Sequence, residues 1–292
     1  MRRSRITITL RQKTVEQVDL LIDHKQIRNR SHAIEYILDN YLQGKVHKAI
    51  ILAGGQGTHL RPYTYEVPKP LLPVQGKPLL EHLIEQLKKS EITEIILCIG
   101  YLGEKIKDYF GDGSKWGIHI VYLEEKEPLF TGGAVKQAQA LVHDAPFLII
   151  HGDILTTLSF QDLIDFHIKE HAVATIALSP TSHPGEYGQF KLQGTKLLDF
   201  YQKSDAKDVK SLLVHTGIYV CEPELFQYFP KTSDTFLLED IITKIIDQKK
   251  GNGFMFEGQW FDVGSTENYE KAIKEFKTSP SPDQKSSKLK KQ

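Results

Sequence analysis

A glycine-rich turn followed by cations stands after the apolar run 49–52 of this sequence. The run is short and branched enough to be a buried parallel strand, and the turn at residues 53–58 would expose backbone N–H groups at its end. Such groups suit a phosphate or a planar base. Arg61, Lys69 and Lys77 follow among prolines that stiffen the loop. The chemistry that this arrangement predicts is the binding of an anion such as a nucleotide.

The glycine turn departs from the two common phosphate-binding patterns. A P-loop requires Gly-Lys-Ser/Thr at a fixed spacing, and none follows here. The dinucleotide-binding fingerprint requires a third glycine at the position that Leu60 occupies. The sequence therefore predicts a nucleotide site of another kind.

Carboxylates after two later apolar runs are candidates for further chemistry. Asp153 follows the run 147–150, at the edge where ligands bind in open α/β sheets, and an aspartate there suits Mg²⁺. Glu125, or its neighbour Glu124, follows the run 118–123. A carboxylate only accepts hydrogen bonds, whereas guanine presents N1–H and N2–H₂ donors along one edge, so this position favours GTP. A solvated acidic loop is the alternative interpretation of this charged stretch.

The elements that must position these groups alternate between strand and helix from residue 48 onward. This order predicts an α/β fold with a Rossmann-like, mostly parallel mixed sheet flanked by helices. The predicted strands are 49–52, 94–99, 118–123, 147–150 and 174–178, and the predicted helices are 79–89, 104–110, 135–142, 163–171 and 268–276.

The stretch 48–82 resembles the signature of the sugar-nucleotide pyrophosphorylases, which are sugar-1-phosphate nucleotidyltransferases. The matches include Gly54-Gly55, Gly57-Thr58, residues 68–71 and residues 76–78. One position departs from the pattern, because His59 stands where the family has an arginine that helps to hold the triphosphate. A histidine lacks the bidentate fork and is mostly neutral at neutral pH, so Arg61 is the candidate to replace that arginine.

Later segments resemble the same family in the same order. Residues 124–134 resemble its second nucleotide loop, with Phe130 in place of a glycine, where a ring would either crowd the base or stack on it. Residues 186–188, 200–204, 214–219, 236–240 and 260–265 resemble the YG, FxEKP, NxGIY, FxxExD and WxDxGT motifs of the family. Gln202, Ser204 and His215 depart from these motifs.

This resemblance implies transfer of a nucleotidyl group from a nucleoside triphosphate to a sugar 1-phosphate, with Mg²⁺ as cofactor and pyrophosphate as the leaving group. It is nearest to guanylyltransferases acting on mannose 1-phosphate or a manno-heptose 1-phosphate, and a uridylyl-, thymidylyl- or cytidylyltransferase is the alternative. The implied catalytic residues are Lys69, Arg61 and Lys203. The candidate nucleotide-binding residues are Leu52, Ala53, Gly54, Gly55, Gly57, Thr58, Glu125 and Gly132. The implied sugar-binding residues are Gly188, Thr216, Gly217 and Glu239, and the metal ligands are Asp153 and Asp262.

Residues 1–44 are predicted to be a separate unit, too small to bury a core alone. Residues 5–10 alternate as a half-buried strand, a helix is expected over 13–24, and a second helix follows the N-cap Ser31. Strand–helix–helix of this length resembles the ribbon-helix-helix DNA-binding family, whose members fold as dimers. The outward residues Arg5, Thr7 and Thr9 would read base edges in the major groove, and the helix N-terminus at Ser31 would face a phosphate. The alternative is a unit that only makes the enzyme a homodimer or larger oligomer.

A second functional hypothesis follows from the departures at His59, Phe130 and Gln202. The chain would then be a DNA-bound regulator whose weakened transferase domain, residues 46–276, senses nucleotide or sugar nucleotide. Overall charge is balanced at 37 basic and 37 acidic residues, so no general affinity for polyanions is implied. Two cysteines in apolar runs and the lack of a long apolar stretch predict a reduced, cytoplasmic protein with no membrane partner. Residues 277–292 are expected to be a disordered basic tail.

Overall fold

The computed structural model describes residues 6–23, 27–43, 46–142, 145–202 and 209–277. The chain divides into two units, Met1–Lys45 and Val46–Gln292. Three predictions lie outside the described residues: the base-reading role of Arg5, the catalytic role of Lys203, and the tail from residue 278 onward. No helix among the described residues is long and apolar enough to cross a membrane.

The N-terminal unit contains helices α1 (Gln12–Asp19) and α2 (Arg30–Gln43). Residues 6–11 precede α1 and form no strand in this single chain, and the side chains of Ile6 and Ile8 are 79% and 52% exposed. The predicted strand is therefore absent from the described part of one chain, where it has no second strand with which to pair. Helix α1 also ends earlier than predicted. Thr7 and Thr9 are exposed.

The predicted N-cap of α2 is wrong by two residues. The side chain of Asn29 caps the helix, because its Oδ1 accepts a hydrogen bond from the backbone N–H of His32 at 3.0 Å. Ser31 lies inside the first turn of α2 instead. Arg30 makes two hydrogen bonds to the carboxylate of Asp19, at 2.6 and 2.8 Å, which join the start of α2 to the end of α1.

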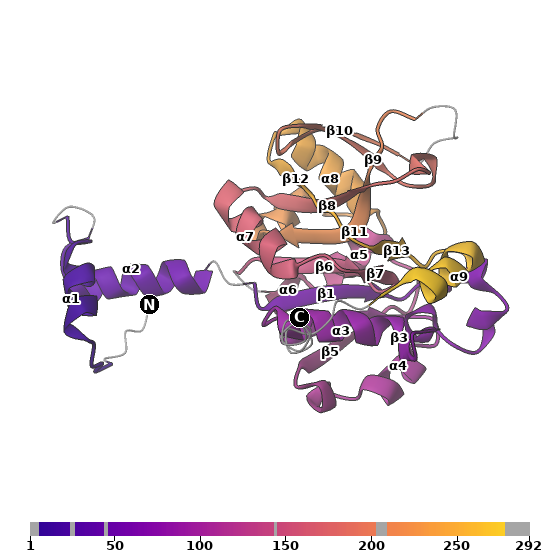
Figure 1. The fold of residues 1–292 in the computed structure, drawn as a ribbon, viewed down its shortest axis with the longest axis horizontal. Coiled ribbons are helices and arrows are strands. Elements are labelled where there is room, and N and C mark those ends of the chain that lie inside the picture. Colours follow the sequence, from indigo (N-terminus) through magenta and orange to yellow (C-terminus); the bar gives the residue numbers. More distant parts are fainter. Residues whose placement is uncertain (1–5, 24–26, 44–45, 143–144, 203–208, 278–292) are drawn as a thin grey trace, which may run out of the picture. The chain divides into compact units, whose positions relative to one another are not determined.

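A nine-stranded mixed sheet forms the centre of the second unit, with the order β5-β4-β1-β6-β11-β8-β12-β10-β9 (Figure 1). Its strands are β1 (Lys48–Ala53), β4 (Glu94–Ile99), β5 (His119–Glu124), β6 (Phe147–His151), β8 (Ala174–Pro180), β9 (Gln189–Gln193), β10 (Lys196–Tyr201), β11 (Leu213–Cys221) and β12 (Gly251–Met255). Strands β5, β4, β1 and β6 are parallel, and β11 runs antiparallel to both β6 and β8. The predicted α/β fold with a mixed sheet flanked by helices is confirmed, but the sheet is not mostly parallel. Strand β12 pairs parallel with β8, whereas β10 pairs antiparallel with both β12 and β9.

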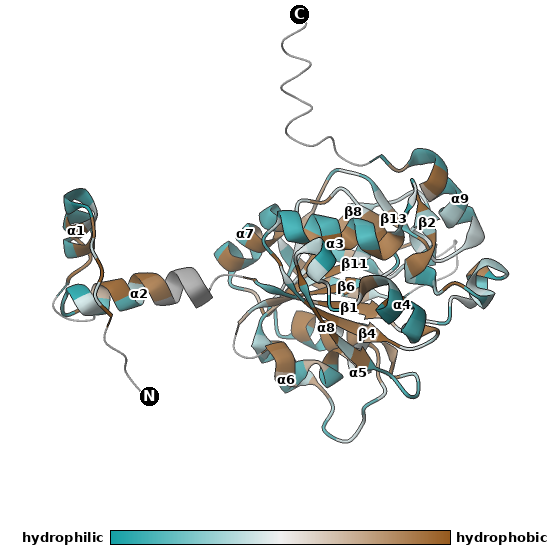
Figure 2. Cartoon of the chain, turned by 90° about the horizontal axis from the view of Figure 1, so that it is seen from below, coloured by the Kyte–Doolittle hydropathy of each residue, from teal (hydrophilic) through white to brown (hydrophobic). Residues whose placement is uncertain are grey.

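Helices cover both faces of the sheet (Figure 2). Helices α3 (Leu79–Lys89), α4 (Gly103–Phe110) and α7 (Phe160–Glu170) bury their apolar sides in one core, and α5 (Phe130–Gln137), α6 (Gln139–Val142) and α8 (Leu238–Asp247) bury theirs in the other. Alternate strand residues serve the two cores: Ile51 belongs to the first and Ile50 to the second. Short 3₁₀ helices at Thr58–Leu60, Tyr63–Tyr65, Lys69–Leu71, Ser114–Trp116, Pro184–Glu186 and Pro223–Tyr228 complete the unit.

A small second sheet pairs β7 (Ile154–Thr156) with β13 (Trp260–Asp262), next to helix α9 (Thr266–Glu275) at one end of the main strands (Figure 1). Together with the hairpin of β2 (Pro73–Val74) and β3 (Lys77–Pro78), these elements form a third apolar core. Asp262 stands opposite Ile154 in the β13–β7 ladder. The pairing therefore brings the late Asp262 next to Asp153.

Candidate active site

A cavity of about 530 Å³ opens at the carboxyl ends of β1, β4, β5 and β6. Five of the predicted nucleotide-binding residues line it: Leu52, Ala53, Gly54, Gly55 and Glu125. Lys69 and Asp153 line it as well. The cavity has the volume of a small-molecule site and lies where ligands bind in open α/β sheets.

The glycine turn packs closely against the opposite wall of this cavity. A Cβ on Gly54 would lie 2.8 Å from Oε1 of Glu125, so a larger residue would displace that carboxylate. Gly57 has a left-handed backbone with φ of +62°, and its carbonyl accepts a hydrogen bond from Oγ1 of Thr64 at 2.7 Å. Gly57 and Thr58 lie outside the cavity lining. The role that the structure supports for Gly57 is therefore to turn the chain.

The structure separates the neighbouring carboxylates Glu124 and Glu125, and it places Gly132 away from the cavity. Glu125 lines the cavity, whereas Glu124 is exposed and pairs with Lys107 on α4. This placement selects Glu125 from the two neighbouring carboxylates. Gly132 does not line the cavity: it lies within α5, where its missing side chain lets Phe236 approach.

Glu125 presents a half-buried carboxylate to the cavity. Its backbone N–H donates to the carbonyl of Ile99 at 2.8 Å, and its Oε2 accepts a hydrogen bond from the N–H of Leu129 at 3.2 Å. Burial raises the pKa of this carboxyl group, and the Leu129 hydrogen bond offsets part of that rise. A fixed carboxylate of this kind can accept hydrogen bonds from the edge of a base.

An ion pair joins Lys69 to Asp153 at the other side of the cavity, with Nζ 2.5 Å from Oδ2. Burial by itself would lower the pKa of Lys69, but the charge and hydrogen bond of Asp153 and the charge of Asp262 raise it above its ordinary value. Burial likewise opposes ionisation of Asp153, yet Lys69 and His151 hold the pKa of that carboxyl below its usual range. Both partners are therefore charged at neutral pH.

Asp153 and Asp262 are close neighbours, because the N–H of Val263 donates to the carbonyl of Asp153 at 3.1 Å. The donor set of two carboxylates fits Mg²⁺, which commonly takes one or two protein carboxylates and completes its shell with substrate phosphates and water. Within the described residues, no group of three or more His, Cys, Asp or Glu side chains is arranged to hold a metal. The ligands beyond the two carboxylates would therefore come from substrate or water.

Three of the predicted sugar-binding residues, Gly188, Thr216 and Gly217, lie near the rings of His151 and His215. A Cβ on Gly217, whose φ is +74°, would lie 2.9 Å from the ring of His151, and a Cβ on Gly188 would lie 2.5 Å from the ring of Phe200. The side chain of Thr216 is buried and donates to the carbonyl of Ala177 at 2.9 Å. Both glycines therefore allow close packing around the ring groups of this region, and Thr216 can offer ligands only its backbone.

The aromatic residues Tyr187 and Trp260 lie near Asp262. Trp260 donates from Nε1 to the carbonyl of Thr216 at 3.0 Å, and Tyr187 packs edge-on against Trp260 with ring centroids 5.1 Å apart. Burial, followed by the charge of Asp262, raises the pKa of Tyr187 to about 12. The Tyr187 hydroxyl is thus a neutral hydrogen-bonding group beside a carboxylate.

Two neighbouring histidines lie at and behind the cavity wall, with ring centroids 6.3 Å apart. Burial, followed by the neighbouring His151, lowers the pKa of His215 to about 4, so His215 is neutral at physiological pH. The buried Nε2 of His151 has no hydrogen-bond partner among the described residues, and His151 lines the cavity. Sequence reasoning missed His151, although its place directly before Gly152-Asp153 at a strand end was a usable signal. It also missed Tyr101, Lys126 and Thr131, which line the cavity from loops and a helix start.

The structure does not bring Arg61 to the cavity. Its guanidinium lies over the ring of Tyr65, 5.2 Å from the centroid, and its side chain is exposed. His59 is exposed as well. Of the predicted phosphate-binding cations within the described residues, Lys69 alone lines the cavity.

The sequence that forms this site matches a known protein family. The family described as nucleotidyl transferase matches residues 48–279, which is most of the chain. This chain belongs to the nucleotidyl transferase family. The matched region begins at β1 and includes every residue that lines the cavity.

Curated relatives of this nucleotidyl transferase carry different nucleotide names. The D-glycero-alpha-D-manno-heptose 1-phosphate guanylyltransferase of Aneurinibacillus thermoaerophilus is 33% identical over 228 residues, covering 78% of this chain and 97% of that protein. A UTP–glucose-1-phosphate uridylyltransferase of Synechocystis is 31% identical, covering 78% of this chain and 62% of its own length. The mannose-1-phosphate guanyltransferase of Yarrowia lipolytica is 31% identical, with 76% and 62% covered. The match thus spans less than two thirds of two of these relatives.

Solved structures share the fold. HddC from Yersinia pseudotuberculosis superposes with a TM-score of 0.67 at 25% identity, over 80% of this chain and all of that one. A UDP-glucose pyrophosphorylase complexed with UDP-glucose superposes with a TM-score of 0.70 at 21% identity, over 79% of this chain and 98% of that one. The second likeness concerns the fold alone.

Proposed function

We propose that this chain is a sugar-1-phosphate guanylyltransferase that converts GTP and a sugar 1-phosphate into a GDP-sugar and pyrophosphate. The observation that carries the proposal is the ion pair of Lys69 and Asp153, with Asp262 beside it, in the cavity that the glycine turn and Glu125 also line. This constellation provides a base-binding wall and a charged phosphate region within one site. The family to which the chain belongs supports the same chemistry.

The proposed reaction is an in-line displacement at the α-phosphorus of GTP. An oxygen of the sugar 1-phosphate forms a new bond to that phosphorus, and the bond to the β-phosphate bridging oxygen breaks, so that pyrophosphate leaves with the electron pair. Catalysis of this kind depends on positioning and charge neutralisation rather than on a side-chain nucleophile. Lys69 would neutralise phosphate charge, and the glycine turn would hold the nucleotide through backbone groups. Mg²⁺ held by Asp153 and Asp262 would supply further neutralisation of the phosphates.

The preference for GTP rests on Glu125. Its half-buried carboxylate is fixed by Leu129 on the cavity wall and can accept the N1–H and N2–H₂ donors of guanine. Two named relatives are guanylyl- or guanyltransferases, and a structure of HddC is complexed with GMP-PN. For the sugar, these relatives support mannose 1-phosphate or a manno-heptose 1-phosphate. A uridylyl-, thymidylyl- or cytidylyltransferase is the alternative, which the Synechocystis relative supports.

Pyrophosphate release tests the proposal. The purified chain would be incubated with Mg²⁺ and each pairing of GTP, UTP, dTTP, ATP or CTP with a sugar 1-phosphate. We expect the highest rate with GTP and a manno-configured sugar, and an Asp153→Asn variant serves as the inactive control. A higher rate with another triphosphate would overturn the guanylyl assignment, and no release with any pairing would overturn the enzyme assignment.

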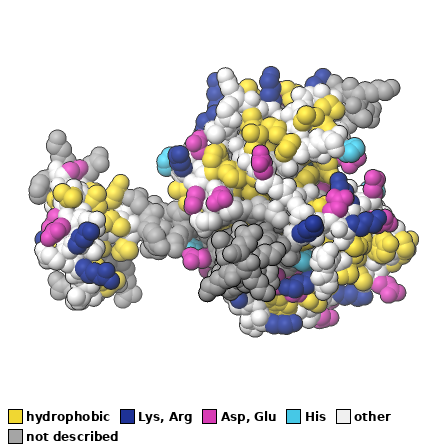
Figure 3. Space-filling model, in the orientation of Figure 1, with side chains coloured by type: hydrophobic (Ala, Val, Ile, Leu, Met, Phe, Trp, Pro, Cys, Tyr) yellow, Lys and Arg dark blue, Asp and Glu magenta, His cyan; other side chains and the backbone are white. Residues whose placement is uncertain are grey.

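For the N-terminal unit we propose pairing with a second copy of the chain. The alternating residues Ile6, Ile8 and Leu10 are exposed in the single chain, and burying them against a second strand would remove apolar surface from water. Figure 3 shows hydrophobic side chains at the surface of this unit next to Lys and Arg side chains. The exposed residues Thr7 and Thr9 alternate with the apolar ones and would be free to contact DNA.

The second candidate function, a DNA-bound regulator that senses nucleotide or sugar nucleotide, is favoured by the position of Arg61. The family has an arginine at the position of His59. Because Arg61 stacks on Tyr65 outside the cavity, it does not take over the role of that arginine. Gel retardation at physiological salt with a pool of DNA sequences tests this function, with a deletion of residues 1–44 as the control. Sequence-specific retention by an inactive chain would favour the regulator, and its absence at that salt concentration would exclude DNA recognition.

A further inference from the structure

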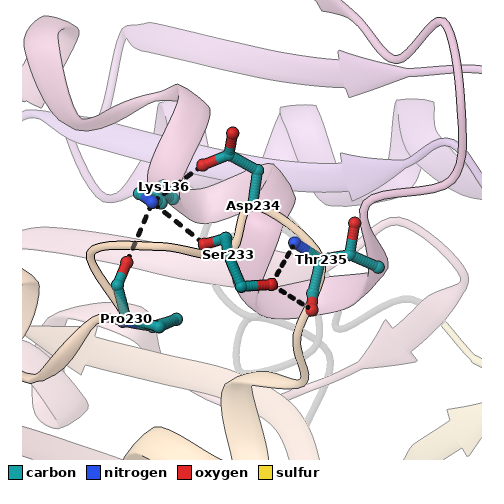
Figure 4. Close-up of polar contacts among 5 residues, drawn as sticks. All are labelled: Lys136, Pro230, Ser233, Asp234 and Thr235. Atoms are coloured by element: carbon teal, nitrogen blue, oxygen red, sulfur yellow. Dashed lines mark hydrogen bonds and ion pairs between the residues drawn. The ribbon is translucent and has the colours of Figure 1, made fainter.

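One side of helix α5 packs against the segment 230–239 and is hydrogen-bonded to it. The ammonium group of Lys136 donates hydrogen bonds to the carbonyls of Pro230 and Ser233, at 2.9 and 3.0 Å, and to Oδ1 of Asp234 at 2.7 Å (Figure 4). The side chain of Ser233 in turn bonds both the N–H and the carbonyl of Thr235. These contacts fix the loop that leads into α8.

Two glycines let this loop lie directly on α5. A Cβ on Gly133 would lie 2.0 Å from the carbonyl oxygen of Asp234, and a Cβ on Gly132 would lie 2.4 Å from the ring of Phe236. The carbonyl of Phe236 accepts a hydrogen bond from the N–H of Gly132 at 3.0 Å. The contact is therefore backbone on backbone, with little freedom for either element to slide.

Thr131 joins the start of α5 to the start of α8. Its Oγ1 accepts a hydrogen bond from the N–H of Leu238 at 2.9 Å and lies 3.2 Å from Oε2 of Glu239, to which it donates. Thr131 also lines the nucleotide cavity. Thr131 is thus a residue of the cavity wall whose hydroxyl group is bonded to the start of α8.

Glu239 acts electrostatically on the region of the predicted sugar-binding residues. Its charge raises the pKa of Tyr219, after burial, and it opposes the lowering of the pKa of His215. Tyr219 and His215 are themselves joined, with the tyrosine hydroxyl 3.2 Å from Nδ1 of His215. The charge of Glu239 therefore acts on His215 and Tyr219, and Thr131, which holds Glu239, lines the cavity.

We propose that Thr131 is a positioning residue that holds Glu239 for the sugar 1-phosphate from the wall of the nucleotide cavity. This inference rests on the proposed transferase function and adds a residue that couples its two half-sites. Loss of the hydroxyl should weaken binding of the sugar 1-phosphate selectively, because the nucleotide contacts proposed for the glycine turn, Lys69 and Glu125 are untouched.

Three variants test this role. Thr131→Val is close in shape but lacks the hydroxyl group, and it should raise the KM for the sugar 1-phosphate about tenfold, which corresponds to about 1.4 kcal/mol, with less than twofold change in the KM for GTP. Thr131→Ser retains the oxygen and should restore the KM for the sugar. Lys136→Met loosens the same helix–loop contact away from the cavity, and it should lower Tm without changing the ratio of the two KM values.

Each outcome decides the proposal. The inference is overturned if both KM values rise equally in Thr131→Val, if Lys136→Met has the same effect, or if Thr131→Ser does not restore the KM for the sugar. Any of these results would make Thr131 merely structural. An active parent enzyme would still leave the transferase function standing. If the parent releases no pyrophosphate, the rise in Tm on adding a sugar nucleotide is compared with that on adding GTP. A selective loss of the sugar-nucleotide response in Thr131→Val supports the positioning role, and equal responses overturn it.

Discussion

Replacing Glu125 by glutamine should have opposite effects on base selection and on stability. Glutamine keeps the shape and one acceptor oxygen, but it replaces the second acceptor by an NH₂ group that opposes the donors of guanine. A bidentate contact with a base edge provides about 1–3 kcal/mol of discrimination. The hydrogen bond from Leu129, at 3.2 Å, uses one lone pair of Oε2 and leaves acceptor capacity on both oxygens. We therefore expect kcat/KM for GTP to fall roughly 10- to 100-fold, with a much smaller change for UTP.

The stability effect follows from the pKa of Glu125. Burial raises that pKa in the folded state, so the carboxyl group contributes stability below its unfolded pKa and loses that contribution as pH rises through the folded pKa. The glutamine variant carries no charge to desolvate. Its Tm should therefore exceed that of the parent at pH 7, and the difference should vanish below a pH of about 4.3, the ordinary value for a glutamate.

The assay compares kcat/KM for GTP and UTP by pyrophosphate release, alongside thermal unfolding between pH 4 and pH 8. Glu124→Gln is the matched control, because Glu124 pairs with Lys107 outside the cavity lining and should leave base selection unchanged. A GTP/UTP ratio that stays within about twofold of the parent in Glu125→Gln would refute the assignment of the base contact. Equal losses for both nucleotides would mean that Glu125 supports the cavity wall without reading the base.

Three further outcomes follow from the same site. Lys69→Met should lower kcat about 10²- to 10³-fold, measured by pyrophosphate release. It should also lower Tm, because the carboxylate of Asp153 loses its ion-pair partner. Adding Asp153→Asn to that variant should restore Tm but not activity. Phe130→Gly should stabilise the chain by about 1 kcal/mol, since Phe130 holds a φ of +57° that suits glycine. It should also raise the KM for GTP, because the exposed ring that lines the cavity is lost. An unchanged KM would exclude stacking of the ring on the base. Gly217→Ala should destabilise the chain by at least about 1 kcal/mol through backbone strain at φ of +74° and contact with His151, and a Tm equal to that of the parent would contradict the observed packing.

The elements that the sequence predicts well are those with a simple periodic pattern. Helix α3 and strand β4 begin and end at the predicted residues, because an amphipathic period of 3.6 and a continuous branched run are local properties. Strand β12 went unpredicted, since Gly251 and Gly253 are poor strand formers. A Cβ on Gly253 would lie 2.6 Å from Leu192 and 2.8 Å from Leu178, so the position has no room for a side chain. The strand conformation of β12 therefore depends on pairing with β8 rather than on the strand propensity of its own residues.

The candidate site divides in the same way. Residues in short motifs at strand ends, such as Gly54 and Asp153, could be placed in the cavity from sequence because chain connectivity determines where a strand ends. The orientation of Arg61 could not, because its stacking on Tyr65 depends on how a surface loop folds back. The link between Thr131 and Glu239 joins residues far apart in sequence, so only the packing of α5 against α8 reveals it.

The two-stranded sheet of β7 and β13 makes the neighbourhood of Asp153 and Asp262 depend on two distant chain segments. Strand β13 bonds to β11 through Trp260 and pairs with β7, Val263 directly after it packs in the third apolar core, and the strand brings Asp262 with it. A polypeptide that stops short of this strand could still assemble its nine-stranded sheet and glycine turn, yet it would hold nucleotide beside a single acidic group. In the proposed transferase, docking of this late strand would complete the pair of carboxylates at Asp153 and Asp262.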